Sequence, residues 1–145
     1  MRVMVFVKGN EQTEAGVMPT EQELAEMGAF NEELVKAGIM LDGDGLRPTS
    51  DAKRVEYSAT SEPRIIDGPF TESKEVVAGY WIWQVKSIDE ALEWARRIPF
   101  KEGAVEIRPF FEADDFGEAF TPELRAQEER LRAETAARRE QQKSH

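Results

Sequence analysis

Two segments of the chain are apolar at both odd and even positions. Residues 2–8 (RVMVFVK) place three valines on one side and Met4 and Phe6 on the other. Residues 76–85 (VVAGYWIWQV) are longer, rich in β-branched and aromatic residues, and apolar on both sides again. Strands of this kind are typical of the middle of a sheet that is covered on both faces. We therefore predict central strands at 2–8 and 76–85.

Two further segments repeat their apolar residues at helical spacing. A capping box precedes each of them, in which a hydroxyl residue is followed three positions later by glutamate. The first box begins at Thr20 and predicts a helix at 20–37, which Gly38 ends. The second box begins at Ser87 and predicts a helix that Pro99 ends.

Shorter apolar runs predict the remaining strands, which we place at 39–41, 54–57, 64–67 and 104–110. Polar residues predict a loop at 9–19, and Asp-Gly-Asp-Gly predicts a tight turn at 42–45. Strands and helices then follow in the order βαββαβ, with an extra hairpin between the two halves. The predicted fold class is therefore α+β and ferredoxin-like.

Two helices can cover only one face of such a sheet, yet both central strands are apolar on both faces. An uncovered apolar face marks an interface. We expect the same face of a second subunit to cover it, in a twofold homodimer. The alternative is that residues 40–66 fold back over this face.

Beyond residue 112 the composition becomes acidic and then strongly charged. We predict a domain at 1–112 and, at 113–145, an acidic linker followed by a charged helix that begins at Thr121. Leu124 and Leu131 are seven residues apart and are compatible with a short coiled-coil seam. The other interpretation is a solvated helix that packs only a few residues.

Composition narrows the classes of function. The formal net charge of −10 disfavours nucleic acid and anionic membranes as partners. The chain has no cysteine, and its one histidine is the terminal His145, so we expect no metal, no cofactor and no imidazole-based catalysis. No segment has the length of a membrane span, and we expect a cytoplasmic protein.

Candidate chemistry gathers in the stretch Ile-Asp-Gly-Pro-Phe-Thr-Glu-Ser-Lys-Glu, residues 66–75. Asp67 could act as a general base or could hold the turn that Asp-Gly favours. Glu72, Lys74 and Glu75 could bind a polar ligand, or they could form weak ion pairs at a solvated strand entry.

Two residues outside this stretch are further candidates for ligand binding. Arg47 could hold a carboxylate or phosphate, or it could form a surface ion pair, for instance with Asp44. Tyr80 could stack on a ligand, or it could belong to the core or the dimer interface.

Residues 67–75 (DGPFTESKE) resemble the signature of the DGPF branch of the YCII-related (YciI-like) family. Further stretches are similar in the same order, among them Gly-Asp-Gly-Leu-Arg-Pro at 43–48 and Ala-Val-Glu-Ile-Arg-Pro at 104–109, so the resemblance covers residues 1–112. It implies a dimeric α/β-barrel of two ferredoxin-like subunits. It also implies a regulatory partner, since some members are thought to accompany sigma factors.

The chain departs from a histidine–aspartate pair that such relatives carry. The histidine would lie in the first helix, which has none between residues 20 and 38, and Ile98 stands where the aspartate of Asp-Pro-Phe would be. We therefore favour a non-enzymatic module that binds a small ligand or a regulatory partner. The alternative is an enzyme for a small organic acid or lactone-like substrate, with proton transfer by Asp67 or Glu72 and anion binding by Arg47 or Lys74.

Overall fold

The structure is a computed structural model that describes residues 1–70 and 75–143. It divides into two compact units, one from Met1 to Phe110 and one that begins at Phe111. The elements of the first unit are β1 Arg2–Lys8, α1 Glu11–Glu14, α2 Glu21–Lys36, β2 Met40–Gly45, the 3-10 turn η1 Thr49–Asp51, β3 Lys53–Glu56, β4 Arg64–Asp67, β5 Val77–Gln84, α3 Ile88–Arg96 and β6 Val105–Pro109. The second unit contains the 3-10 segment η2 Ala113–Ala119 and helix α4 Pro122–Lys143.

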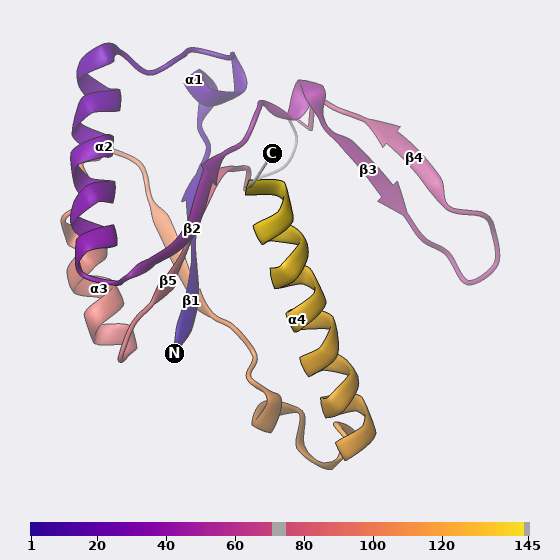
Figure 1. Ribbon diagram of the computed structural model, residues 1–145. Helices are drawn as coiled ribbons and strands as arrows, with labels where there is room; N and C mark the ends of the chain where they lie inside the picture. The colour runs from indigo at the N-terminus through magenta and orange to yellow at the C-terminus, as the bar shows by residue number, and fades with distance from the viewer. Residues whose placement is uncertain (71–74, 144–145) are drawn as a thin grey trace. The chain divides into compact units, whose positions relative to one another are not determined.

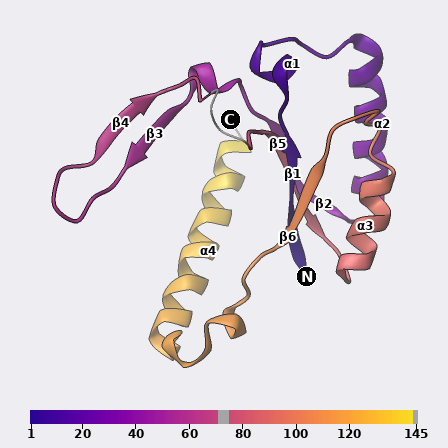
Figure 2. The ribbon, with the colours of Figure 1, turned by 180° about the vertical axis from the view of Figure 1, so that it is seen from behind.

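The first unit is built on a four-stranded antiparallel sheet in the order β2-β5-β1-β6. Helices α2 and α3 lie on the same side of this sheet, as both views show (Figures 1 and 2). The mixed α+β architecture is consistent with the predicted ferredoxin-like fold. Strands β3 and β4 pair in a separate two-stranded sheet, which is the predicted extra hairpin. Strand β2 joins the edge of the main sheet, so residues 40–45 do not fold over its second face.

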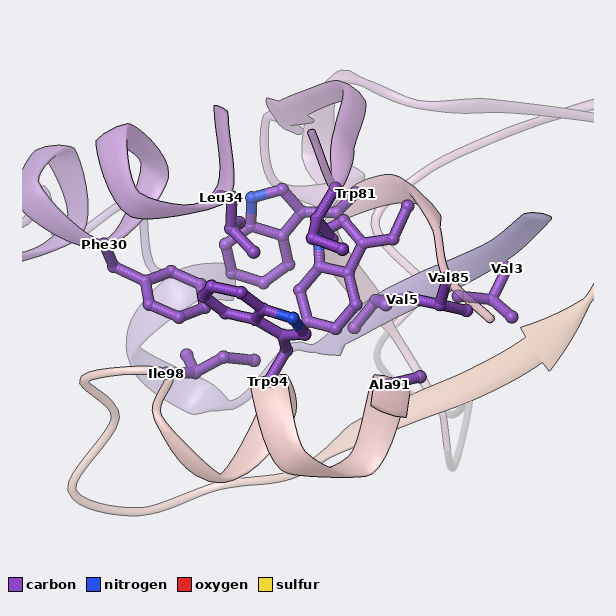
Figure 3. Packing of buried hydrophobic residues seen from close by; sticks show 11 residues of the cluster. Val3, Val5, Phe30, Leu34, Trp81, Val85, Ala91, Trp94 and Ile98 are labelled. Carbon is purple, nitrogen blue, oxygen red and sulfur yellow. The ribbon is translucent and has the colours of Figure 1, made fainter. Parts of the chain in front are cut away.

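The core lies between the sheet and these two helices. Trp81 and Trp83 of β5 pack with their rings 5.7 Å apart. Phe30 of α2 meets Trp81 edge to face at 5.9 Å (Figure 3). Trp83 is fully buried together with Val3, Val5 and Leu34. Its indole N–H has no hydrogen-bond partner among the described residues. Apolar burial therefore holds this face together.

The first helix begins as its capping box predicts. The Thr20 hydroxyl accepts a hydrogen bond from the Glu23 backbone N–H at 3.1 Å, and the Glu23 carboxylate accepts from the Thr20 N–H at 3.3 Å. Gly38 follows the helix with a φ of +73°, a conformation that favours glycine. The second box is only half formed, because Glu90 accepts from the Lys86 N–H instead of from Ser87.

Two local predictions are wrong. The loop at 9–19 contains the single turn α1, because Asn10 and Thr13 cap each other's backbone N–H groups. The Asp-Gly-Asp-Gly segment at 42–45 is part of strand β2 and not a tight turn. Gly43 is needed there for close packing, because a Cβ at this position would lie 2.7 Å from the Trp81 side chain.

The second face of the sheet carries the other set of apolar residues from the central strands. Met4 pairs with Ile82 and Phe6 pairs with Tyr80 across β1 and β5. All four alternate with the buried residues of the core and are half-buried. Arg108 is in register with Met4, and Glu106 with Phe6, so charged residues of β6 border the apolar centre.

The second unit combines an aromatic cluster with a charged helix. The rings of Phe111, Phe116 and Phe120 lie 5.1 and 5.7 Å apart in sequence order. Helix α4 has no buried residue, and Leu124 and Leu131 are 44% and 47% exposed. No described helix has the length and apolar character that crossing a membrane requires.

Candidate functional site

Gly68 is at the centre of a tight corner between β4 and η1. Its N–H donates to the Ala52 carbonyl at 2.9 Å, and the Gly68–Pro69 peptide bond is cis. A Cβ on Gly68 would lie 1.7 Å from the Thr49 carbonyl oxygen, so no side chain fits at this position. Glycine is thus required because two stretches of backbone touch. We call residues 49–52 and 67–70 the signature corner.

Phe70 completes the signature corner. Its backbone N–H donates to the Thr49 hydroxyl at 3.0 Å. The guanidinium carbon of Arg54 lies 4.0 Å from the centre of the Phe70 ring. This is a cation–π distance and fastens β3 to the corner.

Asp67 lies on the surface at the end of β4. Its carboxylate accepts a hydrogen bond from the Lys53 ammonium at 2.6 Å, across the β3–β4 pair. The Asp67 side chain is 72% exposed and the Lys53 side chain 67% exposed. No bond from Asp67 to a backbone amide is formed among the described residues. Asp67 therefore braces the hairpin through a side-chain pair and not through the local backbone.

The other predicted ligand-binding residues do not converge on one point. Arg47 is exposed in the segment after β2, and among residues 1–70 and 75–143 it forms no ion pair, with Asp44 or another carboxylate. Tyr80 lies on the second face of the sheet. Glu72 and Lys74 fall outside the described residues, and their predicted roles stay predictions.

Glu75 connects the signature to the end of β1. Its carboxylate lies 3.4 Å from the Lys8 ammonium, which is also 3.6 Å from Glu106. The Lys8 side chain is only 21% exposed, whereas that of Glu75 is 72% exposed. Two carboxylates therefore hold a partly buried cation at this edge of the sheet.

A cavity of about 750 Å³ opens beside Lys8. Its walls are the ends of β1 and β5, the segment 10–19, the first turns of α2, and the loop 99–104. We call residues 10–19 the strap. A cavity of this size matches the usual volume of small-molecule sites. Asp67, Arg47 and Tyr80 are not among its lining residues.

The polar groups of the cavity were not predicted as site residues. Glu23 and Glu26 line it from α2, but Glu23 is engaged in the capping box and Glu26 accepts a hydrogen bond from Gln22 at 3.1 Å. Lys101 is exposed in the loop 99–104 that lines the cavity and has no ion-pair partner within the described part of the chain. Phe100 next to it is 42% exposed and packs 6.5 Å from Trp81.

The sequence did contain a signal for this location. The histidine–aspartate pair of YciI-like relatives would fall on the first helix and at Ile98 before Pro99. The Pro99–Phe100 step, which follows the position of the absent aspartate, lines the cavity, and so do the first turns of the helix on which the histidine is absent. The described residues contain no cluster of His, Asp or Glu that could hold a metal ion.

Comparisons with known proteins relate the chain to others by sequence. A protein of Rhizobium meliloti (strain 1021) that is described as uncharacterised is 34% identical over 92 residues, which cover 61% of this chain and 73% of the relative. The sequence profile of the YCII-related domain matches residues 1–114, which include the main sheet, the hairpin and the cavity. The chain therefore belongs to the YCII-related domain family.

Proposed function

We propose that the protein is a non-enzymatic module that binds a small organic acid in the cavity beside Lys8. The observation that carries the proposal is the cavity itself, which combines an apolar wall with a cation. Phe100, Val7 and Ala104 offer apolar surface, and Lys101 offers an ammonium group that no described residue neutralises. A carboxylate joined to an apolar body would match both features.

Lys8 contributes less to anion binding than its position suggests. Its ammonium group is already shared by Glu75 and Glu106, so its charge is compensated. Glu23 and Glu26 place negative charge on the α2 side, and Glu102 lines the cavity next to Lys101. An anion is therefore expected to contact the Lys101 ammonium, because the carboxylates of the lining repel it.

Thermal-shift and calorimetric titration with a panel of aliphatic and aromatic carboxylic acids, each paired with its methyl ester, tests this function. We expect some acids to raise the melting temperature, and the esters to raise it less. Lys101→Met should weaken binding about tenfold, the loss expected for one exposed charge-assisted contact. Lys86→Met, outside the cavity, is the matched control. If no acid binds, or if Lys101→Met binds as tightly as the wild type, the proposal fails.

We also propose that the protein is a homodimer through the second face of the sheet. Met4, Phe6, Tyr80 and Ile82 form an apolar centre there, and β6 supplies a charged border. Such a patch is the usual mark of a subunit interface. Sedimentation velocity at micromolar concentration should give a dimer, and Phe6→Asp a folded monomer. Leu92→Asp on α3 should remain dimeric. A wild-type monomer would contradict the proposal.

A further inference from the structure

The strap has few means of holding its own position. Its backbone hydrogen bonds are local, such as Ala15 N–H to Glu11 O and Val17 N–H to Gln12 O. Helix α1 has four residues and none of them is buried. Val17 and Met18 are 60% and 79% exposed, so they add little apolar anchoring. One helical turn without burial is not stable by itself.

Glu14 supplies the missing attachment. Its carboxylate accepts a hydrogen bond from the Thr49 backbone N–H at 3.0 Å and another from the Thr49 hydroxyl. Within the part of the chain that the structure describes, these are the hydrogen bonds that join residues 10–19 to a distant segment. Both are charge-assisted and half-buried, which makes them stronger than ordinary surface bonds.

Thr49 in turn is fixed by the signature corner. Its hydroxyl donates to Glu14 and accepts from the Phe70 backbone N–H, so the three residues form a continuous chain of hydrogen bonds. The Thr49 carbonyl sits against Gly68, where no Cβ fits. The position of Thr49 therefore depends on the Gly-Pro-Phe backbone, and the position of Glu14 depends on Thr49.

We infer that Glu14 is a positioning residue for the cavity, and that the signature corner sets the position of the cavity wall through it. This inference rests on the proposed function in one respect only, namely that the cavity is the binding site. It gives the signature a role that needs no catalysis by Asp67. The corner holds Thr49, Thr49 holds Glu14, and Glu14 holds the strap against the cavity.

Hydrogen–deuterium exchange tests the attachment without any ligand. In Glu14→Ala, the amides of residues 14–17 should exchange about tenfold faster, because the strap loses both charge-assisted bonds. Glu11→Ala is the matched control. It removes the same charge from the same helical turn, and the Glu11 side chain forms no hydrogen bond or ion pair with the described residues. Equal exchange in the two variants would overturn the inference.

Thiol labelling measures access to the cavity. The chain has no cysteine, so Ala78→Cys places a single reporter on the cavity wall at the start of β5. We expect N-ethylmaleimide to label this thiol several-fold faster when Glu14→Ala is added. Adding Glu11→Ala should leave the labelling rate unchanged. An unchanged rate with Glu14→Ala would show that the strap keeps its position without Glu14.

A second pair of variants separates positioning from general destabilisation. Thr49→Val removes the hydroxyl but keeps the shape and the backbone N–H, whereas Thr49→Ser keeps both polar groups. Strap exchange and thiol labelling should rise in Thr49→Val and return to wild-type values in Thr49→Ser. If Thr49→Val and Thr49→Ser show the same exchange and labelling rates, the Thr49 hydroxyl does not hold the strap in place. These readouts need no ligand, so they distinguish failure of this inference from failure of the proposed function.

Discussion

The packed side of the sheet and the signature corner are held together by different forces. Trp83 and Leu34 are fully buried among apolar neighbours. At the corner, Asp67 and Lys53 are exposed, and what fits closely is backbone: Gly68 against Thr49. The packed side tolerates polar change poorly because it loses burial, whereas the corner tolerates side-chain change at its surface but no added atom at its centre.

The described part of the signature, residues 67–70 and 75, contributes contacts that hold the fold together. The described signature residues provide a close backbone contact at Gly68, hydrogen bonds from the Gly68 and Phe70 N–H groups, a cation–π contact and two ion pairs. The cavity lies elsewhere, and the corner reaches it through Thr49 and Glu14. Four substitutions test this contrast between the packed side and the corner.

Trp83→Ala should have the largest effect. Removing a fully buried indole leaves a cavity in the core and should lower the free energy of unfolding by about 4 kcal/mol. Urea unfolding followed by the fluorescence of Trp81 and Trp94 measures it. Leu131→Ala, at a position 47% exposed on α4, should cost well under half as much. A similar loss in both would mean that burial does not distinguish the two sites.

Gly68→Ala should come next, with a loss of about 2 to 3 kcal/mol, because the added methyl group meets backbone and forces the corner apart. Gly28→Ala in α2 is the matched control. Its Cβ would meet nothing within 4 Å, and alanine favours a helix, so stability should rise by up to about 1 kcal/mol. Changes of opposite sign in the free energy of unfolding, measured with urea, would support the close backbone contact at Gly68. Equal effects would refute it.

Asn31→Leu tests a hydrogen bond on the packed side of the sheet. The Trp81 indole N–H donates to the Asn31 side-chain oxygen at 3.0 Å in a half-buried setting. Leaving this donor unpaired should cost about 1.5 kcal/mol. Asn31→Asp keeps an acceptor and should retain more of the stability. Thermal unfolding of the two variants ranks them, and the reverse order would show that the hydrogen bond contributes little.

Asp67→Asn should have the smallest effect, about 0.5 kcal/mol or less, because the pair with Lys53 is exposed and water screens it. Raising the salt concentration to about 1 M should shrink the difference further. Ligand titration belongs in the same experiment. If Asp67→Asn abolished binding or turnover of an organic acid while stability stayed unchanged, the catalytic hypothesis for Asp67 would replace the bracing role.

Most of the secondary structure could be predicted because its causes are local. The alternation in β1 and β5, the Thr20 capping box and Gly38 each have a signature within a few residues. The segment 42–45 was mispredicted because Gly43 is required by the indole of Trp81, some forty positions away in the chain. Glycine in a turn and glycine under an aromatic ring look alike in a sequence.

The candidate site was harder to predict for the same reason. Asp67, Arg47 and Tyr80 have residue types that suit ligand binding, but the fold does not bring them to the cavity. Phe100 and Lys101 line the cavity. The one feature of their local sequence that points to them is Ile98, which stands where the aspartate of relatives would be. Glu14 has no distinguishing feature in its polar stretch of sequence, and only the fold brings it beside Thr49.

The sequence by itself determined the family, the order of strands and helices, and which faces of the central strands are apolar, because capping and periodicity act over a few residues. Only the tertiary structure decided that Gly68 touches Thr49, that Glu14 is fastened to the same threonine, and that the cavity opens beside Lys8. The first contact joins residues 19 positions apart and the second joins residues 35 positions apart, and the cavity walls come from segments still more distant in the chain. Chain packing, and not local preference, selects such contacts.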